Sequence, residues 1–291
     1  MSVTASLHDE SRVRVVNRVS DLRSTVAAWR KQDARIALVP TMGALHAGHI
    51  SLVEAAKRHA DRVVMSIFVN PTQFAPNEDF AAYPRRFQED AQKFSAADGD
   101  LVFAPDVAEM YPEGFATTVM PEGPAKAGLE DRFRPTHFAG VATVVAKLLN
   151  QCQPDVALFG EKDYQQLKVI ARMARDLDLD SEIVGVPTLR DPDGLAMSSR
   201  NLYLSIEERA RASHLYVALM RCAEDLRAGR DIASAQAAAW KALESAGFVP
   251  DYIEARHAET LAPVARRDEG SLRLLAAARL GTTRLIDNIP V

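Results

Sequence analysis

The sequence predicts an α/β fold in which helices cover both faces of a parallel β-sheet, followed by a smaller α+β domain. From residue 36 onward, short apolar runs alternate with longer amphipathic ones, a rhythm typical of βαβ units. The apolar runs are rich in Val, Ile and Phe without polar alternation, as in strands buried on both faces. Beyond about residue 200, two helical stretches precede two extended ones, which indicates a different architecture.

The expected elements of the parallel sheet can be assigned from these runs. A polar stretch that ends at residue 99 takes the place of the second helix in a βαβαβ series, and an irregular section follows at 106–136. The expected strands are at 36–41, 62–70, 100–105 and 155–160. The expected helices are at 49–60, 138–151 and about 163–177.

Pro, Asp and Gly turn signals at 187–199 indicate a hairpin or linker, so we expect domains at 1–188 and 189–291. The second domain begins with a helix whose N-cap and capping-box residues are evident in the sequence. Its expected elements are a helix from Ser205, with Glu208 as capping-box partner, to Gly229, a helix at 233–247, and strands at 248–257 and 273–289.

Composition favours a folded protein that acts on small molecules. The chain has 291 residues, 47% hydrophobic and 25% charged, with a net charge of −4 and a pI near 6.0. This balance argues against a general nucleic-acid or membrane-surface binder. The N-terminus lacks the apolar region of a signal peptide and no apolar run is long enough to span a bilayer, so we expect a cytoplasmic protein. Cys152 and Cys222 are expected to be free, buried thiols.

The stretch PTMGALHAGH, residues 40–49, lies where the first strand should lead into the first helix. Open α/β sheets bind ligands at the carboxyl ends of their strands. His46 and His49 would share a helical face, Gly48 would let a ligand approach, and the helix N-terminus would supply N–H groups suited to phosphate. Two histidines that only cap the helix remain an alternative. A zinc site is disfavoured because the spacing is wrong and no third ligand is evident.

The stretch LFGEKDYQQLKVI, residues 158–170, repeats the arrangement of strand, bend and helix start. Lys162 could neutralise phosphate, and Asp163 could cap the helix or accept a hydrogen bond from a ribose hydroxyl. Gln165 and Gln166 could recognise a small polar substrate without adding charge. The alternative for each of these side chains is a solvated helix start.

Two further stretches carry polar side chains in turn-rich surroundings. In GLAMSSRN, Ser198, Ser199 and Arg200 could clamp a triphosphate through charge-assisted hydrogen bonds. In FVNPTQF, Asn70 and Gln73 should emerge at the carboxyl edge of the sheet and suit a hydroxyl-bearing substrate. An ordinary polar hinge and an Asn-Pro turn are the respective alternatives.

HAGH resembles the HxGH motif of the nucleotidylyltransferase superfamily, and the Walker A and GxGxxG patterns are absent. The four stretches, in this order, resemble the pantothenate synthetase family from about residue 13 to the C-terminus. The resemblance implies a Rossmann-like, doubly wound parallel sheet and a homodimer. It also implies an enzyme that joins pantoate to β-alanine with ATP and Mg²⁺, releasing AMP and pyrophosphate through a pantoyl adenylate. A nucleotidylyltransferase that keeps its adenylated product, or an inactive nucleotide-binding regulator, are the rival hypotheses.

The same resemblance implies roles for individual residues. His49 is the expected acid, with His46 and Lys162 as further catalytic groups, and a charged imidazole would stabilise the departing pyrophosphate. Arg134 and His137 are placed near the substrate mouth. The expected ATP-binding residues are Met42, Gly43, Ala44, Leu45, His46, Ala47, Gly48, His49, Gly160, Glu161, Lys162, Asp163, Leu189, Met197, Ser198, Ser199 and Arg200. The expected pantoate ligands are Gln73 and Gln166, and the expected Mg²⁺ ligand is Asp90, with Glu89 as the competitor.

Overall fold

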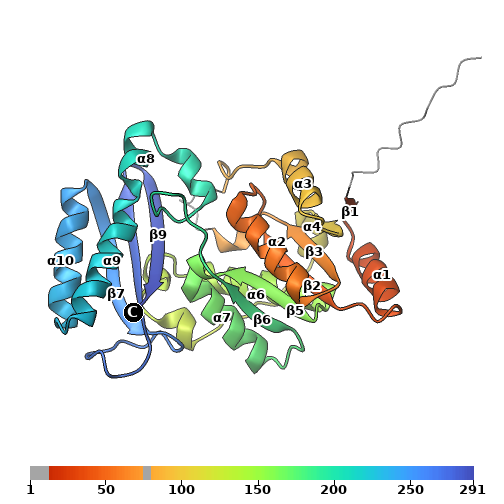
Figure 1. Cartoon of the computed structure of the whole chain (residues 1–291). Helices are drawn as coiled ribbons and strands as arrows, with labels where there is room; N and C mark the ends of the chain where they lie inside the picture. The colour runs from red at the N-terminus through yellow and green to blue at the C-terminus, as the bar shows by residue number, and fades with distance from the viewer. Residues whose placement is uncertain (1–12, 75–79) are drawn as a thin grey trace, which may run out of the picture.

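The computed structural model describes residues 13–74 and 80–291, and its N-terminal part is built on a parallel sheet (Figure 1). The strands are β1 (Arg14–Val16), β2 (Ile36–Thr41), β3 (Arg62–Ile67), β4 (Leu101–Phe103), β5 (Val156–Gly160) and β6 (Glu182–Val186). Their order is β1-β4-β3-β2-β5-β6, with every pairing parallel. The order reverses between β2 and β5, which makes their carboxyl ends the switch point where such sheets bind ligands.

Helices cover both faces of this sheet. On one face lie α1 (Val19–Arg30), α6 (His137–Cys152) and α7 (Tyr164–Asp176), and on the other lie α2 (Ala47–His59) and α3 (Phe87–Ala96). The short elements between them are α4 (Val107–Met110), α5 (Glu130–Phe133) and the 3₁₀ turns η1 (Pro71–Gln73), η2 (Gly123–Lys126), η3 (Glu161–Asp163) and η4 (Ser199–Tyr203). The predicted doubly wound arrangement is therefore confirmed.

The C-terminal part contains a second, antiparallel sheet. Its strands are β7 (Phe248–His257), β8 (Leu272–Leu280) and β9 (Thr283–Pro290), in that order. The helices are α8 (Ile206–Ala212), α9 (His214–Arg227) and α10 (Ile232–Ser245), and α9 and α10 cover one face of the sheet (Figure 1). From the other face, Tyr252, Leu275 and Ala277 join the core of the parallel sheet. The small sheet thus lies between its own helices and the N-terminal part.

The structure differs from the sequence expectations at a few elements. The edge strands β1 and β6 and the helix α1 were not expected, because the strands are short or largely exposed and lack the apolar runs of the central strands. The helix expected from Ser205 to Gly229 is interrupted: Ser213 ends α8 and caps α9, without a Gly or Pro to signal it. The Ser205 capping box is confirmed, since Ser205 Oγ accepts from the Glu208 N–H at 3.2 Å.

Two further expectations concern the described residues as a whole. Cys152 and Cys222 are both free and buried, as expected. Within the described ranges, every helix is too short or too polar to cross a membrane.

Candidate active site

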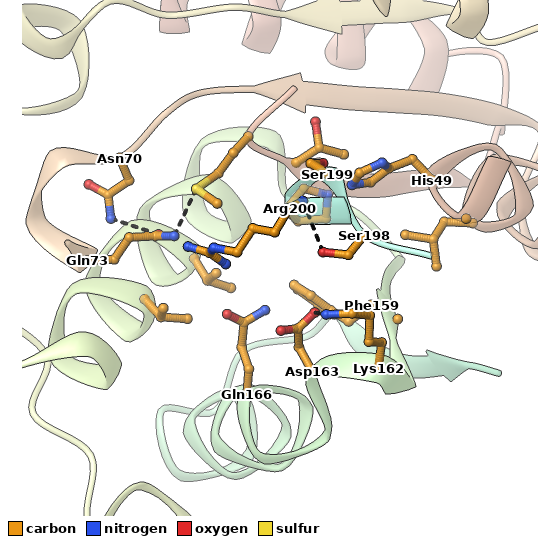
Figure 2. A pocket seen from close by; sticks show the side chains of 18 of the residues that line it. His49, Asn70, Gln73, Phe159, Lys162, Asp163, Gln166, Ser198, Ser199 and Arg200 are labelled. Carbon is orange, nitrogen blue, oxygen red and sulfur yellow. Dashed lines mark hydrogen bonds and ion pairs between the residues drawn. The ribbon is translucent and has the colours of Figure 1, made fainter. Parts of the chain in front are cut away.

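A cavity of about 230 Å³ lies at the carboxyl ends of β2 and β5 and brings the four sequence motifs together (Figure 2). The loop after β2, the turn after β3, the start of α7 and the segment before η4 all contribute to it. The expected residues that line it are Met42, His46, Gly48, His49, Asn70, Gln73, Arg134, His137, Gly160, Lys162, Asp163, Gln166, Leu189, Met197, Ser198, Ser199 and Arg200.

Several expected residues lie outside the lining of this cavity. They are Gly43, Ala44, Leu45, Ala47, Asp90, Glu161 and Gln165. All except the exposed Ala47 and the partly exposed Glu161 are buried, and their contacts hold the walls of the cavity in place. In this structure these residues lie outside the wall of the cavity.

The two histidines of HAGH cap the helix that follows them. His46 is the N-cap of α2, and its Nδ1 accepts from the Gly48 N–H at 3.1 Å. His49 Nδ1 accepts from the His46 N–H at 3.3 Å, and the two ring centroids lie 4.1 Å apart. Because both Nδ1 atoms accept, each neutral ring carries its proton on Nε2. The histidines thus cap the helix and also line the cavity. Their rings accept hydrogen bonds from backbone N–H groups that were expected to bind phosphate.

Both imidazoles are poor proton acceptors in this environment. Burial lowers the pKa of His49 to about 3, with further lowering by His46 and Lys162. Burial and then Lys162 lower the pKa of His46 to about 4. The protein's own groups therefore keep both rings neutral near pH 7, and a charged imidazole would require a bound phosphate to raise its pKa. A Cβ at Gly48 would come within 2.8 Å of the His46 ring, so this glycine is needed for the packing of the cap itself.

Asp90 anchors the loop between β2 and α2. Its carboxylate, on a side chain that is 1% exposed, accepts from the N–H groups of Ala44 at 2.8 Å and Leu45 at 2.7 Å. Gly43 has φ of 84°, and a Cβ there would lie 2.9 Å from Asp90 Oδ2. Lys93 Nζ donates to Leu45 O at 2.8 Å from the same helix, α3. Both the backbone conformation and the amide groups of this loop are thereby fixed.

In this structure both carboxylate oxygens of Asp90, the expected Mg²⁺ ligand, accept from backbone amides. Glu89, the competitor, is exposed and lies 3.5 Å from Arg86. Among residues 13–74 and 80–291, no group of three His, Cys, Asp or Glu side chains is placed to hold a metal ion. Because Mg²⁺ is commonly held by one or two carboxylates together with substrate phosphates, a carboxylate from α3 as metal ligand stays a prediction.

The second motif divides its side chains between the cavity and the surrounding structure. Lys162 and Asp163 both line the cavity, and Lys162 Nζ lies 4.0 Å from Asp163 Oδ2. Gln166 lines it too, but the neighbouring Gln165 points elsewhere and is 3% exposed. Its Oε1 accepts from the Glu130 N–H, and its Nε2 donates to Pro124 O and to Asp131 Oδ1. Gln165 thus supports the segment around α5 and does not recognise substrate.

Gln73 is held at the opposite side of the cavity from Lys162 (Figure 2). Its Oε1 accepts from Asn70 Nδ2 at 3.2 Å, and its Nε2 donates to Met42 Sδ at 2.9 Å. Its backbone oxygen accepts from His137 Nδ1 at 3.0 Å and from Arg134 at 3.4 Å. Asn70, 1% exposed, is a scaffold residue that shapes this turn. His137 and Arg134 likewise act on the backbone that carries Gln73.

The third motif closes the cavity from the C-terminal part. Met197 N–H donates to Leu189 O at 3.0 Å, and Ser198 Oγ accepts from the Arg200 N–H at 3.3 Å. Ser199 Oγ donates to Ala44 O at 3.1 Å, which ties this segment to the loop after β2. The Arg200 side chain extends across the pocket between Ser198 and Gln73 (Figure 2). A cation thus lies near the centre of the cavity.

The cavity also has an apolar wall that was not predicted from the sequence. Phe159 at the end of β5 belongs to it, as does Tyr83, which precedes α3. The run VATVVAKLL in α6 is the sequence feature that indicates this wall, because it is apolar around most of the helix and not along one stripe. The α6 residues that line the cavity are Val141, Val144, Val145 and Leu148. The site therefore combines cationic and amide groups with an apolar surface.

A family model described as pantoate-beta-alanine ligase matches residues 14–290. The chain belongs to this family. It is 62% identical to pantothenate synthetase 2 of Bradyrhizobium diazoefficiens over 277 residues, covering 95% of this chain and 98% of that one. It is 61% identical to a pantothenate synthetase of Rhodopseudomonas palustris over 270 residues, covering 93% and 95% of the two chains. The family resemblance expected from the four motifs is therefore confirmed.

Solved structures of family members have the same fold. The pantothenate synthetase of Thermus thermophilus superposes with a TM-score of 0.89 at 49% identity, covering 95% of this chain and 99% of the other. The pantoate-beta-alanine ligase of Francisella tularensis, solved in complex with beta-gamma ATP and beta-alanine, has a TM-score of 0.79 at 35% identity. That match covers 96% of this chain and 97% of the other.

Proposed function

We propose that this chain condenses pantoate with β-alanine at the expense of ATP, giving pantothenate, AMP and pyrophosphate through a pantoyl adenylate. Membership of the ligase family over residues 14–290 supports this reaction. The Francisella relative, complexed with beta-gamma ATP and beta-alanine, supports ATP as the co-substrate. The observation that carries the proposal is that cationic, amide and apolar groups from four motifs line one cavity at the switch point.

In the first step, the pantoate carboxylate attacks the α-phosphorus of ATP and pyrophosphate leaves. Gln73 and Gln166 suit the hydroxyls of pantoate, because neutral amides do not lock the attacking carboxylate into an ion pair. The apolar wall that includes Val145, Leu148 and Phe159 suits the two methyl groups of pantoate. Binding in this way orients the nucleophile without reducing its reactivity.

Charge that develops on the departing phosphates needs donors and cations that are already in place. Lys162 and Arg200 supply positive charge, and Ser198 adds a hydroxyl. His46 and His49 supply neutral Nε2–H donors, because their Nδ1 atoms are engaged in the cap. Preorganised groups of this kind stabilise a transition state more than a ground state.

The nucleoside would lie toward the segment before η4. Asp163 suits a ribose hydroxyl, and the backbone of Leu189 suits the adenine edge, since both line the same cavity as Lys162. In the second step, the β-alanine amine attacks the acyl carbon and AMP leaves. The bound adenylate and amine need only close approach, so no nucleophilic side chain takes part.

We expect Mg²⁺ to arrive with the phosphates of ATP, since small divalent ions are often held by substrate phosphates and one or two carboxylates. The chain would act as a homodimer in the cytoplasm. Its domains would divide at residue 188, so that the phosphate loop from Met197 to Arg200 belongs to the second domain. No bound nucleic acid or membrane is needed for this chemistry.

The purified chain should form pantothenate and AMP from pantoate, β-alanine, ATP and Mg²⁺, and omission of either acid should stop pantothenate synthesis. Formation of ADP and phosphate would contradict the proposal. Pyrophosphate release with retention of an adenylated product and no response to β-alanine would favour a nucleotidylyltransferase. ATP binding without AMP under every substrate combination would favour a regulatory nucleotide-binding protein.

A further inference from the structure

Asn288, on β9 of the C-terminal sheet, is hydrogen-bonded to the turn that carries Lys162. Its Nδ2 donates to Glu161 O and to Lys162 O, both at 2.9 Å. Its Oδ1 accepts from Arg273 Nε at 2.7 Å, and the residue is 3% exposed. Both amide hydrogens and the amide oxygen are thus used, and a flipped amide would place oxygen against two carbonyl oxygens. The orientation of this side chain is therefore fixed by its partners.

Arg273 on β8 reinforces the same turn. Its NH2 group donates to Glu161 Oε2 at 2.9 Å, and its guanidinium lies 4.1 Å from the centre of the Tyr164 ring. Tyr164 is the first residue of α7. Arg273 and Asn288 together therefore hold the backbone, an acidic side chain and the helix start on both sides of Lys162.

The residue before Asn288 holds the other nucleotide segment. Asp287, 4% exposed, forms a bidentate pair with Arg190 at 2.7 and 2.9 Å. Arg190 also donates to Asn288 O at 3.3 Å. It directly follows Leu189, whose carbonyl oxygen accepts from the Met197 N–H. Two consecutive residues of β9 thus connect the Lys162 turn with the segment that leads to Ser198 and Arg200.

We propose that Asn288 is a positioning residue that sets the place of Lys162 relative to the phosphates of ATP. It lies outside the lining of the cavity and acts through the backbone of η3. A displacement of about 1 Å at a transition-state contact can cost on the order of 100-fold in rate. The inference rests on the proposed function, in which Lys162 stabilises the departing pyrophosphate.

The decisive variant is Asn288→Asp. It keeps the size of the side chain and its contact with Arg273, but it places an oxygen against the carbonyls of Glu161 and Lys162. We expect kcat/KM for ATP in pantoate-dependent ATP–pyrophosphate exchange to fall about 10- to 100-fold. The reaction of preformed pantoyl adenylate with β-alanine should change less than about twofold, since no pyrophosphate leaves in that step. If this variant does not fold, Asn288→Ser, which is uncharged and too short to reach both carbonyls, should show the same selective loss.

Two controls separate positioning from general support. Tyr252→Phe removes another buried hydrogen bond between the two parts of the chain, from Tyr252 Oη to Glu130 Oε1 at 2.8 Å. It should lower the thermal midpoint without a selective loss in exchange. In a Lys162→Ala background, Asn288→Asp should lower kcat/KM in exchange by less than about a further twofold, because the effects of mutating residues that act as one unit are not additive.

Equal losses in both half-reactions would overturn the inference. So would independent effects in the Lys162→Ala background, or the same selective loss in Tyr252→Phe. A wild-type chain that forms no AMP would refute the proposed function itself. If the wild type is active but Asn288→Asp, like Tyr252→Phe, lowers only the thermal midpoint without a selective loss in exchange, only the role of Asn288 is refuted.

Discussion

His46 and His49 show how one pair of side chains serves both structure and chemistry. Their Nδ1 atoms cap α2, so the Nε2–H groups are the donors that they can offer. Their lowered pKa values also carry a cost in stability. The pKa values in the folded protein, about 4 and about 3, lie below the ordinary 6.5, so the unfolded chain binds protons first as the pH falls. These histidines should therefore reduce stability progressively below about pH 6.5.

His49→Ala and Lys162→Ala should each lower the rate of adenylation by about 100- to 10,000-fold, because each removes a donor or charge from the departing pyrophosphate. Single-turnover formation of pantoyl adenylate measures this rate. His59→Ala and Lys57→Ala are matched controls, since both side chains lie at the exposed end of α2. Near-normal adenylation in either active-site variant would contradict the role assigned to that residue.

At the scale of elements, the loop between β2 and α2 depends on α3, whose side chains bind it from 45 to 48 residues later in the chain. Its amide groups bind Asp90, and its carbonyl oxygens bind Lys93 and Ser199. The conformation includes positive φ at Gly43 and at Ala44, where φ is 51°. A non-glycine residue in this region is strained, and the surrounding contacts must hold it there. The shape of the HAGH motif is thus imposed by α3 and by the segment before η4.

Asp90→Asn should lower the free energy of unfolding by about 1–3 kcal/mol, because one of two buried amides loses its acceptor. Urea denaturation without ATP or Mg²⁺ measures this loss. Glu89→Gln, on the exposed neighbour, should stay within about 0.5 kcal/mol of wild type. Unchanged stability together with activity restored by excess Mg²⁺ would instead support a metal-binding carboxylate.

At the scale of the whole molecule, a buried ionic cluster joins α5 of the N-terminal part to the C-terminal sheet. Glu130 on α5 accepts from both terminal nitrogens of Arg284 on β9, at 2.7 and 2.9 Å. Arg284 also pairs with Asp251 at 2.6 Å, and Tyr252 donates to Glu130. Burial alone would raise the pKa of Glu130, but the hydrogen bond and charge of Arg284 lower it below the ordinary 4.5. The cluster is placed to hold the C-terminal sheet against the N-terminal part.

Because the pKa of Glu130 is lower in the folded state, its stabilisation is present above about pH 4.5 and is lost as the pH falls through the folded value. Glu130→Gln should therefore lower stability at pH 7 by about 3–5 kcal/mol, the cost of breaking a buried pair. It should also flatten the dependence of the urea midpoint on pH below about 4.5.

Asp98→Asn, which breaks an exposed pair with Lys57, is the control. Its urea midpoint should change with pH almost as that of the wild type does. If the urea midpoint of Glu130→Gln changed with pH between 3 and 5 in parallel with that of the wild type, Glu130 would not contribute to acid unfolding.

Much of this organisation was predictable from the chain. The central strands β2, β3, β4 and β5 were found because buried parallel strands are continuous apolar runs. The site side chains Gln73, Lys162 and Arg200 were found because they follow such runs or lie in turn-rich segments. The break at Ser213 and the edge strands were missed because neither leaves a strong local signal. The contacts of Asp90 with the amides of Ala44 and Leu45 were not predicted, because a carboxylate on a helix gives the same local pattern whether it binds a metal or a backbone.

The sequence by itself determined the family, the central strands and the helices between them, and which motifs gather at the switch point. These follow from hydrophobic periodicity and from motifs that are local in the chain. Only the tertiary structure decided which polar groups face the cavity and which are used to build it. Asp90 binds amides 45 and 46 residues away, and Asn288 binds carbonyls 126 and 127 residues away. Such long-range hydrogen bonds depend on how the elements pack, and no local pattern of residues encodes them.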